Sequence, residues 1–114
     1  MSVKLTTRQV GDVSVVDVAG RITLGEGSSA LRDALRDMIN KNQKKILLNL
    51  ADVSYIDSSG IGELVSGFTT VTNNGGQLKL LNLTKRVKDL LQITKLYTVF
   101  DVHDDEAAAV RSFA

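Results

Sequence analysis

Apolar residues recur along the chain in two alternating patterns: short runs typical of strands, and three- to four-residue spacings typical of amphipathic helices. We expect strands at residues 3–10, 13–18, 46–50, 78–83 and within 96–102. We expect helices at residues 28–40, 58–73, 84–93 and 104–113. The order β-β-α-β-α-β-α-β-α predicts an α/β fold, with a mixed, mostly parallel sheet and right-handed crossovers.

Local signals set the expected boundaries of these elements. Gly11-Asp12 is typical of a two-residue hairpin between the first two strands. Residues 20–27 are expected to form a loop, after which Ser28 or Ser29 caps the first helix. Thr84 is expected to cap the third helix, whose inward residues are predicted to be Val87, Leu90, Leu91 and Ile93.

The segment Ile46–Leu50 is a nearly continuous apolar run, which predicts a central strand covered on both faces. The chain contains no proline, and no repeat or composition shift marks an internal boundary. A single domain over residues 1–114 is therefore expected.

Composition narrows the classes of function. The chain is 43% hydrophobic and 24% charged, with 14 basic against 13 acidic residues and a formal charge of +1. Neither a basic stripe nor a set of accessible aromatic residues is present, which disfavours nucleic-acid binding. The absence of cysteine excludes disulfides and thiolate metal sites, and no apolar run is long enough for a membrane span or a secretory signal. We expect a cytoplasmic protein without metal or cofactor.

The segment 52–65 carries the candidate chemistry, because it follows a buried strand and leads into a helix. Ligands and partners of α/β sheets meet the carboxyl ends of strands, and a helix start accommodates a serine hydroxyl or an added phosphate. Asp57, Ser58, Ser59, Gly60 and Gly62 lie there. The residues alone leave two interpretations open. The segment is either an open docking surface, or simply an N-cap at Asp57 or Ser58 with glycines that pack the helix on its own sheet.

Two stretches carry a family resemblance: Leu48-Asn49-Leu50, and Asp52-Val53-Ser54-Tyr55-Ile56-Asp57-Ser58-Ser59-Gly60-Ile61-Gly62. They resemble the STAS domain family of bacterial anti-sigma factor antagonists. The resemblance implies that Ser58 is phosphorylated by a partner that is both anti-sigma factor and serine kinase. It also implies that the unphosphorylated form binds this partner and frees the sigma factor, and that a serine phosphatase restores the cycle.

The resemblance also implies a partner surface around Asp57, Ser58, Ser59, Gly60 and Gly62. This chain departs from many antagonists of the family, which carry an aspartate at about the place of Thr23. The loop 23–27 is expected to form a second contact, because it leaves the adjacent end of the sheet. A monomer or weak dimer is expected, without enzymatic activity.

Three alternatives compete with the switch. A serine hydrolase would need a base, but His103 is the only histidine, is expected to be solvated, and no Gly-x-Ser-x-Gly motif is present. Residues 25–30 match Gly-x-Gly-x-x-Ala, a nucleotide-binding pattern, but the preceding loop is expected to be too long for it. The third alternative is a non-switching STAS module, a scaffold in a signalling assembly or a subunit of a lipid-transport system.

Overall fold

The computed structural model of the chain describes residues 3–113, which form a five-stranded sheet in the order β1-β2-β3-β4-β5. The strands are β1 (Val3–Val10), β2 (Val13–Ile22), β3 (Lys45–Ile56), β4 (Gln77–Leu81) and β5 (Val102–His103). β1 is antiparallel to β2, and every other neighbouring pair is parallel. The predicted fold class and element order are confirmed.

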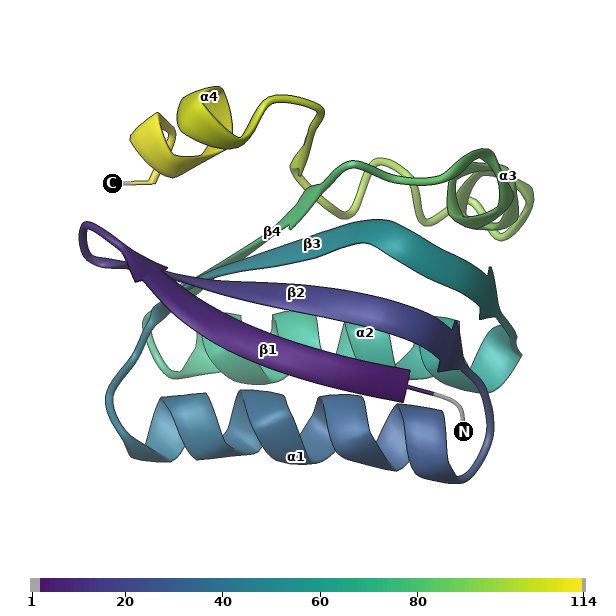
Figure 1. Ribbon diagram of the computed structural model, residues 1–114, viewed down its shortest axis with the longest axis horizontal. Helices are drawn as coiled ribbons and strands as arrows, with labels where there is room; N and C mark the ends of the chain where they lie inside the picture. Colours follow the sequence, from purple (N-terminus) through teal and green to yellow (C-terminus); the bar gives the residue numbers. More distant parts are fainter. Residues whose placement is uncertain (1–2, 114) are drawn as a thin grey trace.

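Helices cover both faces of this sheet. They are α1 (Glu26–Asn40), α2 (Ser58–Asn73), α3 (Lys85–Ile93) and α4 (Glu106–Arg111). Figure 1 shows α1 and α2 side by side below the sheet, with α3 and α4 above it. None of the helices in residues 3–113 has the length and hydropathy needed to cross a membrane.

β3 is the middle strand and is covered on both faces, as predicted. Leu47 and Leu48 are neighbours whose side chains point to opposite faces, and both are fully buried. Leu48 belongs to the larger cluster, which includes the inward residues of α1 and α2. Leu47 belongs to a smaller cluster that packs against Ala109 of α4. Burial on both sides explains the nearly continuous apolar run in this strand.

β2 and β3 both extend beyond the predicted ends of their strands. β2 continues to Ile22 rather than residue 18, and β3 continues to Ile56 rather than residue 50. Polar residues interrupt the apolar pattern here because one face of this part of the sheet is solvent-exposed, while the parallel pairing continues through two register shifts. The expected loop 20–27 therefore shrinks to residues 23–25.

The start of α1 also differs from its prediction. The helix begins at Glu26, and its N-cap is Gly25 with φ 97°, a left-handed conformation that glycine adopts without strain. Ser28 is buried within the first turn, so neither Ser28 nor Ser29 is the cap. In contrast, Thr84 caps α3 as predicted, because its side chain accepts a hydrogen bond from Val87 N.

The last strand and last helix are shorter than expected. Only Val102–His103 pair with β4, and residues 96–101 form turns after α3. Leu96 N donates to Leu91 O at 2.8 Å, which closes the end of α3 instead of extending a strand. Ile93 was predicted to face inward, but 76% of it is exposed.

Candidate partner-binding site

The end of β2 and the start of α2 meet at the edge of the sheet that is formed by the carboxyl ends of β2 and β3, at the right of Figure 1. Ile22 and Ile56 are the last paired residues of β2 and β3, and Asp57 N then donates to Ile22 O at 3.3 Å. The loop that carries Thr23 therefore lies against the helix start that carries Ser58. The two segments predicted to contact a partner are brought together.

The Asp57 side chain joins these two segments. Its Oδ1 accepts a hydrogen bond from Gly60 N at 2.9 Å, and its Oδ2 accepts one from Leu24 N at 3.0 Å. The Gly60 N–H, and after it the Leu24 N–H, hold the pKa of Asp57 below its ordinary value. Of the two caps that the sequence left open, Asp57 is the one used, and it also fixes the loop between β2 and α1.

Ser58 is the first residue of α2, and its side chain is exposed. Within residues 3–113 its hydroxyl forms no hydrogen bond, since Asp57 serves as the cap. Ser59 is half-buried. Of the two serines, Ser58 presents the more accessible hydroxyl to another molecule.

The two glycines of this helix start have different surroundings. A Cβ at Gly60 would overlap the backbone oxygen of Ile22 and lie 2.6 Å from Ile56 Cγ1. Nothing lies within 4 Å of the position a Cβ would take at Gly62. Packing of α2 on its own sheet therefore explains Gly60, whereas Gly62 faces open surface. Gly60 thus allows the start of α2 to lie close to the sheet, and Gly62 is accessible to another molecule.

The loop between β2 and α1 adds a residue that the sequence analysis did not single out. Leu24 is 78% exposed, the highest value among the large apolar residues of the described chain, and its backbone is held by Asp57. Thr23 is half-buried and its carbonyl accepts a hydrogen bond from Ser28 N. One feature of the sequence could have identified Leu24: it is a single leucine beside polar and glycine residues, in a segment expected to be a loop.

The prediction that the loop before residues 25–30 is too long for nucleotide binding is wrong, because only residues 23–25 separate β2 from α1. Two other features disfavour it. A Cβ at Gly27 would lie 2.9 Å from Ile22 Cα, so this glycine serves close packing of α1 on β2. Glu26 also places a carboxylate in the first turn of α1, where a phosphate would need the positive end of the helix dipole.

His103 is largely buried, contrary to the expectation of a solvated side chain, since only 20% of its side chain is exposed. Its Nε2 lies 3.1 Å from Asp101 Oδ2 and 3.4 Å from Ser112 Oγ. A catalytic triad requires different ring nitrogens for the acid and the nucleophile, so this geometry is not one. The Ser112 hydroxyl donates to Ala109 O and accepts from the buried Lys79, which fixes the end of α4.

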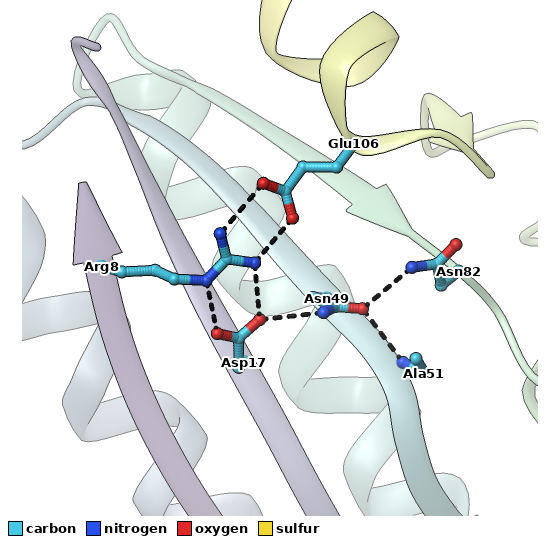
Figure 2. A network of polar contacts seen from close by, with 6 residues as sticks. All are labelled: Arg8, Asp17, Asn49, Ala51, Asn82 and Glu106. Carbon is cyan, nitrogen blue, oxygen red and sulfur yellow. Dashed lines mark hydrogen bonds and ion pairs between the residues drawn. The ribbon is translucent and has the colours of Figure 1, made fainter. Parts of the chain in front are cut away.

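A second polar cluster, which the sequence analysis missed entirely, links β1, β2, β3 and α4 (Figure 2). Arg8 contacts Asp17 through Nε at 2.7 Å and Glu106 through Nη2 at 2.6 Å. Asn49 donates to Asp17 Oδ1 at 2.8 Å and accepts from Asn82. The Arg8 guanidinium, first of all, lowers the pKa of both carboxylates.

The chain resembles known proteins over nearly its whole length. The STAS domain model matches residues 4–109. The anti-sigma-B factor antagonist of Bacillus subtilis (strain 168) is 33% identical over 102 residues, covering 90% of this chain and 92% of that protein. A crystal structure of an anti-sigma factor antagonist from Mycobacterium paratuberculosis superimposes with a TM-score of 0.84 at 17% identity, covering 98% and 94% of the two chains.

The Bacillus cell fate determinant SpoIIAA has the same fold in two states. Its unphosphorylated form matches with a TM-score of 0.71 at 19% identity, covering 95% of this chain and 96% of that chain. Its phosphorylated form matches with a TM-score of 0.73 at 20% identity, covering 95% and 98%.

Proposed function

The chain belongs to the STAS domain family, and on that premise we propose that it is an anti-sigma factor antagonist controlled by phosphorylation of Ser58. Its unphosphorylated form binds a partner that is both anti-sigma factor and serine kinase, and so releases a sigma factor in the cytoplasm. A serine phosphatase reverses the modification. Members of the family are binding proteins rather than enzymes. The observation that carries the proposal is the exposed Ser58 hydroxyl, which makes no hydrogen bond within residues 3–113 and lies on a helix start fixed by Asp57.

The partner surface comprises the exposed part of the α2 start and the adjacent loop: Thr23, Leu24, Asp57, Ser58, Ser59 and Gly62. Gly60 contributes by holding α2 against Ile22. Because backbone hydrogen bonds fix this edge, a partner would bind it without ordering it first, which lowers the entropic cost of association. Leu24 supplies the apolar contact and Ser58 the phosphate acceptor.

A single phosphate on Ser58 would suffice to weaken binding. It adds about −1.5 to −2 charges at pH 7, beside the carboxylate of Asp57. The helix start tolerates that charge, but an interface shaped around a hydroxyl does not, and a loss of about 3 kcal/mol lowers affinity about a hundredfold. SpoIIAA, which keeps the same fold in both forms, supports a switch without refolding.

The test uses the serine kinase encoded beside this gene, with ATP and Mg²⁺, and mass spectrometry of the product. We expect one phosphate on Ser58, lost in Ser58→Ala and retained in Ser59→Ala. Ser58→Ala should bind the kinase like the wild type, and Ser58→Asp about a hundredfold more weakly. Ser59→Asp is the matched control for added charge and should have a smaller effect. Absence of phosphate on Ser58, with kinase binding retained, would overturn the switch and favour a non-switching scaffold.

A further inference from the structure

Two arginines from different elements converge on one tyrosine at the same edge of the sheet. The guanidinium carbons of Arg21, in β2, and Arg86, in α3, lie 4.8 and 4.3 Å from the ring centroid of Tyr55, in β3. Arg21 and Tyr55 are register partners immediately before the Ile22–Ile56 pair, after which α2 begins. Since Ile56 faces Gly60 of α2, Tyr55 points to the opposite face, which carries α3.

The cluster of Arg21, Tyr55 and Arg86 carries two positive charges, and no carboxylate of residues 3–113 neutralises them. Both guanidinium groups are attracted to the same ring, but they repel each other at a separation within the screening length of about 10 Å at 0.1 M salt. Neither arginine forms an ion pair with a carboxylate of residues 3–113, whereas Arg8 and Arg32 do. Two exposed and unpaired guanidinium groups, held together by packing, are complementary to an anion.

The surroundings of Arg86 favour a protein segment over a small anion. Leu90 and Ile93 follow Arg86 on α3 at helical spacing, and the three residues line a shallow hollow with Asp89. Ile93 is 76% exposed, and Asp89 is paired with Lys85. Cationic and apolar side chains therefore lie side by side on the exposed surface of α3, next to the edge that carries Ser58.

We infer that the Arg21–Tyr55–Arg86 cluster binds an acidic segment of the partner protein, beside the Ser58 surface and on the face that carries α3. The inference rests on the proposed function for the identity of the partner. Guanidinium groups bind carboxylates through paired hydrogen bonds, and the tyrosine ring holds both groups in place for that contact. The segment would dock at this cluster whether or not Ser58 is modified, so it supplies affinity and orientation rather than the switch.

The test uses the isolated protein and a hexaglutamate peptide, with the arginine side-chain Nε–H signals observed by NMR. We expect saturable shifts of Arg21 and Arg86 at about 0.01 M salt. The affinity for the peptide should fall at least tenfold when the salt concentration is raised to about 0.15 M, because the screening length falls from about 30 to about 8 Å. The double variant Arg21→Gln/Arg86→Gln should bind at least tenfold more weakly than the wild type. Arg36→Gln, which removes an exposed arginine of α1 on the other face, should bind normally.

Equal binding by the double variant and the wild type would overturn the inference, as would equal weakening by Arg36→Gln. Inorganic phosphate binding as tightly as the peptide would overturn the assignment to an acidic protein segment. Circular dichroism spectra of the variants identify a folding defect, and the single variants, each expected to weaken binding at least threefold, keep the test valid if the double variant does not fold. The Ser58 phosphorylation assay does not involve this peptide, so either result can fail without the other.

Discussion

Two aspartates with lowered pKa values, Asp57 and Asp17, lie in regions that use their side chains differently. Asp57 accepts hydrogen bonds from backbone N–H groups of Gly60 and Leu24, so the edge of the sheet is fixed while neighbouring side chains remain free. Asp17 accepts from the side chains of Arg8 and Asn49, which are thereby occupied. The arrangement around Asp57 builds a rigid surface whose neighbouring side chains are free to contact a partner. The arrangement around Asp17 joins secondary-structure elements and leaves fewer side chains free for such contacts.

The difference extends to the residues around each aspartate. Beside Asp57, Ser58 and Leu24 project into solvent. Around Asp17, Arg8 reaches from β1 to Glu106 of α4 and ties the last helix to the first strand (Figure 2). The Asp57 region therefore suits the partner binding that we propose, whereas the Asp17 region joins the last helix to the first strand.

Gly60→Ala should have the largest effect, because the Asp57 region depends on close backbone packing. The added Cβ meets the backbone of Ile22, which cannot move as a side-chain tip could. We expect the free energy of unfolding to fall by about 2–3 kcal/mol. Urea unfolding followed by far-UV circular dichroism is the measurement, since the chain contains no tryptophan.

Gly62→Ala is the matched control, on the same helix but with open space at the Cβ position. It should be neutral or raise stability by up to about 1 kcal/mol, because alanine favours helix more than glycine does. Equal stability of the two alanine variants would contradict the packing explanation of Gly60.

Arg8→Met should have the next largest effect and should depend on pH. It leaves Asp17 and Glu106 as neighbouring unpaired carboxylates, and we expect a loss of about 1 kcal/mol near pH 7, because the groups are partly exposed. Both carboxyl pKa values are lowered in the folded wild type, so their stabilisation is present above the unfolded values of about 4 and disappears as pH falls through the folded values. Thermal unfolding from pH 7 to pH 2 should show the variant approaching the wild type at acid pH. Arg36→Met should show no such convergence.

The contrast also explains what the sequence could predict. Asp57, Ser58 and Gly60 lie within four residues of the chain and follow a strongly apolar strand, so local patterns predicted the helix start. The family resemblance then selected Ser58 as the candidate serine. The Arg8–Glu106 pair joins residues at opposite ends of the sequence, and no periodicity marks it. Tertiary packing likewise explains the error at Ile93, which follows the apolar spacing of α3 but lies on its exposed side.

Asp57→Asn should have the smallest effect and separates charge from hydrogen bonding at the site. One amide oxygen can replace only one of the two carboxylate oxygens that accept from Gly60 and Leu24, and we expect a loss below about 1 kcal/mol at pH 7 because asparagine remains a good cap. The pKa of Asp57 is lowered by folding, so its contribution is present above the unfolded value of about 4 and is lost as pH falls through the folded value. The difference in unfolding free energy between variant and wild type should therefore shrink toward zero under acid conditions. Asp52→Asn makes the same charge change at an exposed residue of β3 and should stay close to the wild type throughout. A difference for Asp57→Asn that persisted unchanged at pH 2 would show that the cap acts through shape and not through its charge.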